Sequence, residues 1–401
     1  MTESAQRPIV VQKYGGSSLA TLEKVAAVAD RVAATVAAGY RVVAVVSAMG
    51  KTTDGLLTQA KELSQNPAPR ELDMLMSVGE RISTALLAIA LEERGHRAVS
   101  FTGSQSGIIT TARHNRARIV EVRPWRLLDE LDAGKIIVVA GYQGVSYGRE
   151  ITTLGRGGTD TTAVALAAAL GAEHCEICSD VDGVYTADPR LAPDATRLPE
   201  LSHGEMVALA RSGSKVLNQD CVEYASRMGV AIYAKSTFGP RDDAGTVVRL
   251  NPAPTPRPVT ALAHRKRVLE LRLEPGHEPT ALLELMERSG AFPHALQGGG
   301  SEPLHALVPT DDAHRVKALL ESLRGHFGQA LAIREDRGTV TAIGTGLGEE
   351  PQVQKQALAI VAELAGADYR VVLGPLELGF VLPSEHVEAA VQALHAALLG
   401  A

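Results

Sequence analysis

Apolar runs alternate with helically spaced apolar residues along the first 250 residues of the chain. The runs have the length and β-branched content of buried strands: IVVQKY (9–14), RVVAVVSAM (41–49), RAVSFTG (97–103), KIIVVAGY (135–142) and EHCEICSD (173–180). Between them, 19–39, 71–95 and 159–172 show the three-to-four-residue spacing of helices. Such alternation predicts an α/β domain, a mostly parallel sheet sandwiched by helices, with ligands at the carboxyl ends of its strands.

The pattern changes after NPAPTPRPV (251–259), which carries four prolines and is typical of a stiff linker. Beyond it, strand and helix patterns follow one another in a βαββαβ-like order that occurs roughly twice, which predicts two small α+β modules. The strand-like stretches are 268–273, 305–310, 339–346 and 376–383, and the helical ones are 280–290, 312–325, 353–366 and 385–399. We therefore expect domains at 1–250 and 260–401, joined by the linker at 251–259.

Composition and charge narrow the classes of partner. The chain has 401 residues, of which 45% are hydrophobic and 21% charged, and its formal net charge is −6 without a basic block, which argues against nucleic acid. The longest apolar stretch, 161–172, is too short to cross a bilayer, and no secretion signal is visible at the N-terminus, so we expect a cytoplasmic protein without membrane association. The odd count of three cysteines does not suggest a disulfide framework, and CEIC lies in a predicted strand, which favours buried, inert thiols over a redox or zinc pair.

Two glycine turns carry the chemistry. VVQKYGGSSLATLEKV (10–25) joins a strand to a helix through two glycines, an arrangement that binds phosphate with backbone N–H groups and a helix N-terminus. By contrast, Gly-Lys-Thr at 50–52 is not a P-loop, because the required first glycine is Val45; Lys51 is read as a solvated loop lysine. In ITTLGRGGTDTTAVALAAAL (151–170), Arg156 lies among three glycines before a helix, which favours an anion site over a flexible turn capped by Asp160.

A third cluster, CSDVDGVYTADPR (178–190), ends a predicted strand in acidic residues. Carboxylates at that place suit a magnesium ion, a ribose or simple turn capping, and the residues alone leave this choice open.

Taken in order, these stretches resemble the aspartate kinases of the amino-acid kinase superfamily. The resemblance covers most of residues 9–249 and rests on KYGGSS (13–18), VVSAMGKTTDGLL (45–57), MSVGERIS (76–83), GIITTARHNRARI (107–119), GYQG (141–144), TTLGRGGTDTTAVALAAAL (152–170) and SDVDGVYTADPR (179–190). The region 260–401 resembles, more faintly, the paired regulatory ACT modules of the same enzymes.

The resemblance implies transfer of the γ-phosphoryl group of ATP to the side-chain carboxylate of aspartate, with Mg²⁺ held chiefly by ATP oxygens and no dedicated metal ligands. It implies a catalytic role for Lys13, with Asp160 orienting the lysine and Arg156 gripping the α-carboxylate. The implied sites are, for the amino acid, Ser47, Thr53, Glu80, Arg156 and Thr159, and for the nucleotide, Lys13, Gly15, Gly16, Ser17, Ser179, Asp180, Tyr185, Arg190 and Lys215. Simple turn capping stays an alternative for Ser47 and Thr53, and packing for Tyr185.

Departures from the family pattern keep other functions open. Asn218, Gln219 and Asp220 replace the usual His-Pro-Arg, and of the expected effector contact in the first module only Gln297 remains, followed by three glycines. We therefore expect weak inhibition by lysine or threonine, a specialised paralogue with altered feedback control, and a homodimer or higher homo-oligomer formed through the ACT-like modules. The alternatives are a kinase of the same fold for another small amino-acid carboxylate and an inactive, ligand-binding regulatory homologue.

Overall fold

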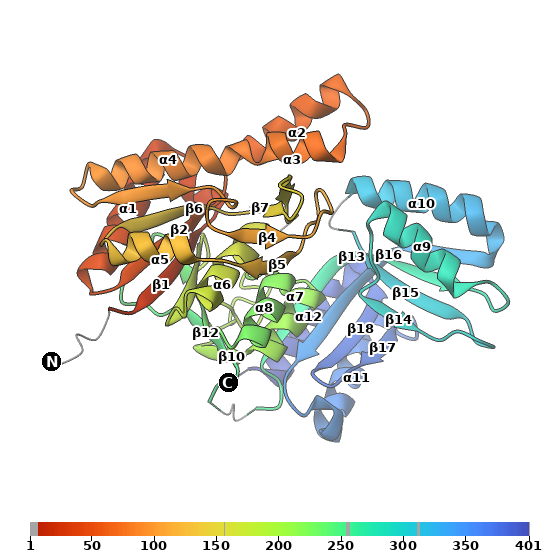
Figure 1. Ribbon diagram of the computed structural model, residues 1–401. Helices are drawn as coiled ribbons and strands as arrows, with labels where there is room; N and C mark the ends of the chain where they lie inside the picture. Colours follow the sequence, from red (N-terminus) through yellow and green to blue (C-terminus); the bar gives the residue numbers. More distant parts are fainter. Residues whose placement is uncertain (1–6, 156, 254–256, 311–312, 401) are drawn as a thin grey trace. The chain divides into compact units, whose positions relative to one another are not determined.

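The computed structural model describes residues 7–155, 157–253, 257–310 and 313–400. The chain divides into two compact units (Figure 1). The first comprises residues up to 184 together with 197–207 and 215–253, and the second comprises 185–196, 208–214 and the chain from 254 onward. The predicted linear division at 251–259 stays a prediction, and residues 254–256 of that linker lie outside the described residues.

An eight-stranded sheet forms the centre of the first unit. Its order is β10-β12-β11-β9-β1-β2-β6-β3, and every neighbouring pair is parallel except β11 and β12. The strands are β1 (Ile9–Tyr14), β2 (Arg41–Val46), β3 (Ala98–Phe101), β6 (Ile136–Ala140), β9 (His174–Ser179), β10 (Glu200–Ser202), β11 (Ile232–Ser236) and β12 (Thr246–Arg249). The mostly parallel sheet predicted from the apolar runs is thereby confirmed, and β1 lies at its interior between β2 and β9.

Side-chain alternation along β1 assigns the helices to the two faces of this sheet. Tyr14 packs in one core with α1 (Leu22–Ala37) and α4 (Val78–Glu92), so its neighbour Lys13 points to the opposite face, where α6 (Gly158–Ala169) packs. The other helices of the first unit are α2 (Thr52–Leu63), α3 (Pro69–Met76), α5 (Trp125–Asp132) and α8 (Gln219–Met228), while α7 (His203–Ser212) spans both units. The sheet thus presents Lys13 to α6.

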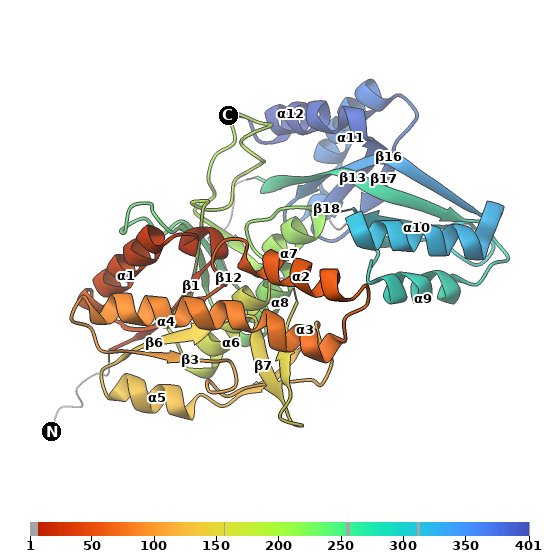
Figure 2. The same ribbon diagram turned by 90° about the horizontal axis from the view of Figure 1, so that it is seen from above.

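Two features of the first unit differ from the sequence pattern. The single helix predicted over 71–95 is two helices, α3 and α4, which meet at Ser77 and run end to end (Figure 2). A second sheet, in the order β5-β4-β7-β8, was not predicted, because its strands have only three or four residues: β4 (Ile108–Thr110), β5 (Ile119–Val122), β7 (Gln143–Ser146) and β8 (Ile151–Thr153). Among the described residues, one stretch, Pro69–Glu92, has the length and composition of a membrane span, and half of its most apolar window is buried in the protein.

The cysteines are free and buried, as the strand pattern indicates. Cys175 and Cys178 lie on β9 and Cys221 on α8. Burial raises the pKa of Cys178 to about 12 and raises the pKa of the other two thiols as well. Such thiols remain protonated near neutral pH, so they lack the thiolate that redox chemistry requires.

The second unit is built on a six-stranded sheet in the order β14-β15-β13-β16-β18-β17, antiparallel throughout. Two βαββα repeats form it, and their long first strands, β13 and β16, lie side by side. The elements are β13 (Ala261–Leu273), α9 (Pro279–Ser289), β14 (Ala295–Gln297), β15 (Leu304–Pro309), α10 (Ala313–Phe327), β16 (Leu331–Ile343), α11 (Pro351–Ala365), β17 (Arg370–Leu373), β18 (Glu377–Pro383) and α12 (Val387–Leu398). The two predicted α+β modules are present, and the sequence pattern missed the edge strands β14 and β17.

A segment that precedes the linker by some sixty positions, 185–196, is part of the second unit. Ala187 and Ala192 are buried in the core that α11 and α12 form on the second repeat. Thr186 anchors the segment: its carbonyl accepts the N–H of Leu262 at 2.7 Å, and its hydroxyl lies 2.9 Å from Nε2 of His395. The core of this unit is therefore assembled from discontinuous parts of the chain.

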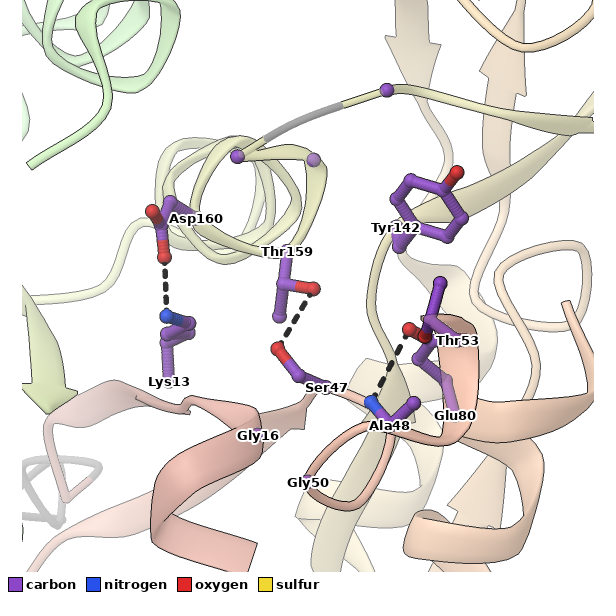
Figure 3. A pocket seen from close by; sticks show the side chains of 13 residues that line it. Lys13, Gly16, Ser47, Ala48, Gly50, Thr53, Glu80, Tyr142, Thr159 and Asp160 are labelled. Atoms are coloured by element: carbon purple, nitrogen blue, oxygen red, sulfur yellow. Dashed lines mark hydrogen bonds and ion pairs between the residues drawn. The ribbon is translucent and has the colours of Figure 1, made fainter. Parts of the chain in front are cut away.

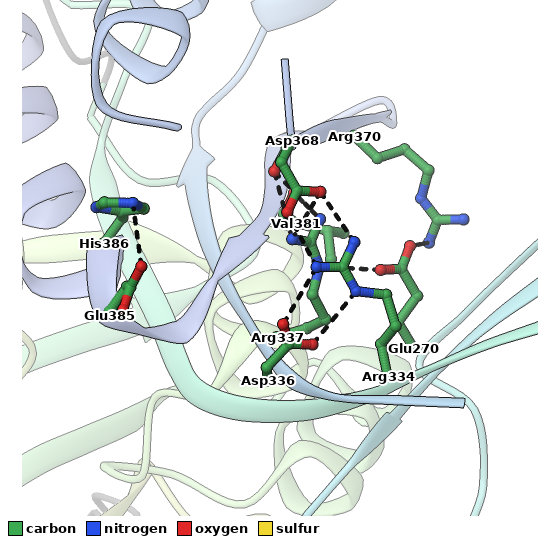
Figure 4. A network of polar contacts seen from close by, with 9 residues as sticks. All are labelled: Glu270, Arg334, Asp336, Arg337, Asp368, Arg370, Val381, Glu385 and His386. Atoms are coloured by element: carbon green, nitrogen blue, oxygen red, sulfur yellow. Dashed lines mark hydrogen bonds and ion pairs between the residues drawn. The ribbon is translucent and has the colours of Figure 1, made fainter. Parts of the chain in front are cut away.

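A buried ion pair joins the two repeats. Arg337 on β16 is 2% exposed and donates from Nε to Glu270 on β13 at 2.9 Å (Figure 4). The Arg337 guanidinium also lies 3.1 Å from Asp368 Oδ1 and donates to the carbonyl of Val381. Both charges are thus withdrawn from water, and Glu270 has a second, longer contact with Arg370 Nη2 at 3.5 Å.

We expect Arg337→Ala to lower the free energy of unfolding by about 3–5 kcal/mol, because it removes the hydrogen-bonded partner of the buried Glu270 and leaves that carboxylate with only the longer contact to Arg370, at 3.5 Å. Chemical denaturation monitored by circular dichroism measures this change. Arg324→Ala, at an exposed ion pair with Glu335, is the matched control, and we expect a loss of no more than about 1 kcal/mol. Equal losses for the two variants would contradict the dependence of Glu270 on Arg337.

Candidate active site

A pocket of about 400 Å³ lies in the first unit, at the carboxyl ends of β1 and β2 (Figure 3). Its walls come from the first glycine turn, the turn after β2, the start of α4 and the loop that leads into α6. The lining residues are Lys13, Gly16, Ser47, Ala48, Gly50, Thr53, Glu80, Tyr142, Gly155, Gly157, Gly158, Thr159 and Asp160. This is the edge of the sheet at which a parallel α/β fold binds its ligands.

Lys13 and Asp160 form an ion pair at one end of the pocket. Lys13 Nζ, near the end of β1, lies 2.6 Å from Oδ1 of Asp160, which belongs to the first turn of α6. Burial alone would lower the pKa of Lys13, but the charge and hydrogen bond of Asp160 outweigh burial and raise it. Lys13 therefore stays protonated, and the carboxylate of Asp160 holds its ammonium group in place.

Two turns and a hydroxyl pair form the middle of the pocket. Ser47 Oγ donates to Oγ1 of Thr159 at 3.1 Å, which links the end of β2 to the N-terminus of α6. The turn after β2 packs directly on the first glycine turn, since Gly50 N–H donates to Gly16 O at 3.0 Å. A Cβ at Gly16 would lie 2.8 Å from the carbonyl oxygen of Ala48, so only glycine permits this approach. The two turns therefore lie in direct contact along one wall of the pocket.

Glu80 lies at the other end of the pocket, on the first turn of α4. Its side chain is almost fully buried, and its Oε1 accepts the backbone N–H of Ala48 at 3.2 Å. Its Oε2 is also buried and finds no hydrogen-bond partner within the part of the chain that the structure describes. Burial raises the pKa of Glu80 to about 7. A buried carboxylate with one free oxygen is suited to a cationic ligand group.

The loop that leads into α6 contacts Asn218, one of the residues that depart from the family pattern. Gly157, with φ of +71°, caps α6, and a Cβ added there would lie 2.2 Å from Cγ of Asn218. Asn218 is itself the N-cap of α8, where its Oδ1 accepts the N–H groups of Asp220 and Cys221. The asparagine therefore begins one helix while its amide packs against the turn that begins another.

The pocket brings together part of the predicted set of site residues. Predicted residues that line it are Lys13, Gly16, Ser47, Thr53, Glu80, Thr159 and Asp160; those that do not are Gly15, Ser17, Ser179, Asp180 and Lys215. Tyr185 and Arg190 belong to the second unit, where Arg190 is paired with Asp188 at 2.6 Å. Arg156 lies outside the described residues, although the glycines on both sides of it line the pocket.

Tyr142 lines the pocket but was not among the predicted site residues. It adopts the left-handed φ of +67°, uncommon for a side chain of this size, two residues after the end of β6. Its backbone carbonyl accepts the N–H of Leu154, which ties it to the glycine loop. The signal that could have identified it is the GYQG stretch (141–144), which follows a predicted strand and is one of the stretches that carry the family resemblance.

Lys51 is exposed at the N-cap of α2 and does not line the pocket, in keeping with its reading as a loop lysine. Across the described ranges, no group of three or more His, Cys, Asp or Glu side chains is arranged to hold a metal ion.

Comparison with known proteins identifies the family. Residues 8–235 match the model of the amino acid kinase family. An aspartokinase of Mycolicibacterium smegmatis is 42% identical over 405 aligned residues, covering 97% of this chain and 96% of the relative, and one of Corynebacterium glutamicum is 41% identical, covering 96% and 95%. The chain belongs to the aspartokinase family.

A solved structure agrees with this membership. E. coli aspartokinase III in complex with aspartate and ADP matches with a TM-score of 0.81 at 26% identity, covering 98% of this chain and all of that one. The predicted family, fold class and enzyme class are thus confirmed: the chain is an aspartokinase, a phosphotransferase of the amino-acid kinase fold. Family membership implies ATP as the phosphoryl donor.

Proposed function

We propose that this aspartokinase transfers the γ-phosphoryl group of ATP to the side-chain carboxylate of L-aspartate, giving 4-phospho-L-aspartate. The observation that carries the proposal is the free, buried Oε2 of Glu80 at the opposite end of the pocket from the Lys13–Asp160 pair (Figure 3). An amino acid with its ammonium group on Glu80 would direct its other end toward Lys13. The pocket thus offers opposite charges to the two ends of a small zwitterionic acid.

The charges present suit phosphoryl transfer to a carboxylate. The side chain of aspartate, with a reference pKa of about 3.9, is ionised at neutral pH and needs no base to become a nucleophile. One of its oxygens forms the new bond to the γ-phosphorus while the bond from that phosphorus to the β–γ bridging oxygen breaks, and ADP leaves with the electron pair. Lys13 neutralises negative charge on the transferred group, and Asp160 holds the lysine in place.

Further roles follow the family resemblance and remain part of this proposal. Glycine backbone and a lysine cation form a donor set that fits phosphate, which supports Gly15, Gly16 and Ser17 beside Lys13 as phosphate contacts. Ser47, Thr53, Thr159 and Arg156 would complete the amino-acid subsite. Ser179, Asp180, Tyr185, Arg190 and Lys215 would contact the nucleotide. Mg²⁺ carried on the ATP oxygens would supply additional charge neutralisation.

Trapping of the acyl phosphate tests the proposed function. Purified protein is incubated with Mg-ATP, hydroxylamine and a panel of amino acids, and hydroxamate is measured by its iron complex. We expect a signal with aspartate that exceeds the signals with glutamate, asparagine and N-acetyl-aspartate, the last of which lacks the ammonium group for Glu80. Signal only with another acid would reassign the substrate, and no signal with any acid would overturn catalysis.

We expect lysine and threonine to inhibit this activity only weakly, which the same assay measures when each is titrated against aspartate. E. coli aspartokinase III has been solved in complex with lysine and aspartate. In this chain Gln297 is exposed and is followed by three glycines with positive φ, a backbone poor in side chains that could recognise an effector. Strong inhibition at low effector concentration would contradict altered feedback control. The homo-oligomer and the cytoplasmic location remain predictions.

A further inference from the structure

Asp73 on α3 is a fully buried carboxylate that the proposed chemistry does not use. Its side chain is 0% exposed, and it receives hydrogen bonds from two other segments of the first unit. The backbone N–H of Asn115 donates to Oδ1 at 3.0 Å, Thr153 Oγ1 donates to Oδ1 at 2.5 Å, and His114 Nδ1 lies 2.7 Å from Oδ2. Such a buried, multiply bonded carboxylate is costly to disturb, because its partners lose their acceptor together.

The partners of Asp73 adjoin the loop that closes the pocket. Asn115 holds a left-handed φ of +62°, and its carbonyl oxygen would lie 3.3 Å from a Cβ at Gly155. Thr153 is the last residue of β8, and its carbonyl accepts the N–H of Ala117 at 2.9 Å. The chain leaves Thr153 and reaches Gly155 two residues later, where the pocket wall begins. Asp73 therefore holds Thr153, which leads into the glycine loop, and Asn115, which lies beside its first glycine. We call these contacts the Asp73 clamp.

Tyr142 connects the same clamp to the pocket. Burial raises the pKa of Tyr142, a hydrogen bond with the Thr153 side chain lowers it, and the negative charges of Glu80 and Asp73 raise it further. The phenol thus lies within electrostatic reach of both carboxylates, one in the pocket wall and one behind it. Leu154, which follows Thr153, donates its N–H to the carbonyl of Tyr142 at 2.9 Å, so the strand end that Asp73 holds is tied to a pocket residue at the next position.

We propose that Asp73 is a positioning residue for the amino-acid subsite: it does not touch substrate, but it fixes Asn115 and Thr153 and thereby sets Gly155 and Tyr142 in the pocket wall. The identity of the ligand in this inference rests on the proposed function. The clamp itself rests on the contacts of Asp73 alone. Because Lys13 and the first glycine turn lie at the other end of the pocket, the effect falls on the amino acid rather than on ATP.

Asp73→Ala in the full-length protein tests the proposal, because it removes both acceptor oxygens and with them the hydrogen bonds to Asn115, Thr153 and His114. We expect the KM for aspartate to rise about 10- to 100-fold, because three buried groups lose their hydrogen-bond partner together, with kcat and the KM for ATP within about threefold of wild type. Thr153→Val, which removes one bond, should give a smaller rise, and His114→Gln, which keeps a donor, the smallest. Asp129→Asn, at an exposed position on α5, is the matched control and should change nothing.

Hydrogen–deuterium exchange without ligand gives a second readout that does not depend on the substrate. In Asp73→Ala, peptides covering 111–118 and 152–158 should exchange faster, while peptides of β1 and β2 keep wild-type protection. Unchanged exchange in the first two peptides, or faster exchange with an unaltered KM for aspartate, would overturn the proposal. A parallel fall in kcat for all substrates with a lower Tm would show a merely structural role and overturn it too. Failure of the wild type to phosphorylate aspartate would refute the proposed function. The hydrogen–deuterium exchange result would then still test whether Asp73 fixes Asn115 and Thr153.

Discussion

Lys13→Ala is expected to lower kcat at least about 10³-fold, because a single preorganised positive group on a transferring phosphoryl is worth that much. The cation is held on the pocket wall by Asp160 at 2.6 Å, and no solvent lysine can take its place in that geometry. Steady-state hydroxamate formation at saturating aspartate and ATP measures the change. The fold should persist, since β1 is secured by its pairing with β2 and β9 along its whole length.

Lys51→Ala is the matched control for Lys13. Lys51 lies in the Gly-Lys-Thr stretch that imitates a P-loop, but it is exposed and precedes α2 outside the pocket lining. We expect its removal to leave kcat within about twofold, as for most exposed side chains without a partner. Near-normal turnover in Lys13→Ala, or a large loss in Lys51→Ala, would contradict a phosphate site at the first glycine turn and would indicate Lys51 instead.

Glu80→Gln is expected to weaken aspartate binding and to stabilise the free protein. Without the carboxylate, the substrate ammonium loses a buried, charge-assisted partner, so the KM for aspartate should rise about 30- to 100-fold, equivalent to about 2–3 kcal/mol. Glu92→Gln, at an exposed position on the same helix, should leave KM unchanged. An unaltered KM for aspartate in Glu80→Gln would remove Glu80 from the subsite.

The stability of the same variant should depend on pH in a definite direction. The pKa of Glu80 is about 7 in the folded protein, above the value of about 4.3 for an unfolded chain. The unfolded state therefore binds fewer protons between these values, so the carboxylate destabilises the free protein increasingly as pH rises through them, by up to the order of 3 kcal/mol. Glu80→Gln should raise the Tm of the ligand-free protein at pH 8 and leave it nearly unchanged at pH 4. A Tm that falls at pH 8 would contradict this assignment.

Much of the first unit could be predicted because its strands are long apolar runs buried on both faces. The β1 and β2 runs, for example, need no tertiary information to be recognised, and the glycines beside Lys13 and Arg156 mark where the chain must turn close to a ligand. The residues that sequence reasoning missed depend on tertiary contacts. Tyr142 enters the pocket through a left-handed backbone conformation, and Asp73 lies in a helix whose partners are about 40 and 80 residues away. No local pattern marks either one.

The short strands β4, β5, β7 and β8 escaped prediction for a related reason. With three or four residues each, they have too few alternations to separate a strand from a loop, and their stability comes from pairing with one another. The break at Ser77 was missed because the apolar spacing continues through it. Of the nucleotide residues suggested by family resemblance, Lys13 and Gly16 line the pocket and the others do not, so the roles of the others depend on experiment rather than on geometry.

The discontinuous make-up of the second unit restricts how this protein can be divided. A chain ended at the proline-rich linker would keep 185–196 but lose α11, α12 and β13, leaving Ala187 and Ala192 without the core that buries them and Thr186 without its contacts to Leu262 and His395. A fragment that begins at the linker would lack 185–196, and with it Ala187 and Ala192 of its own hydrophobic core. The two α+β modules therefore cannot be exchanged between relatives as a C-terminal cassette; a working chimera must carry the donor's 185–196 and 208–214 together with its chain from 254 onward.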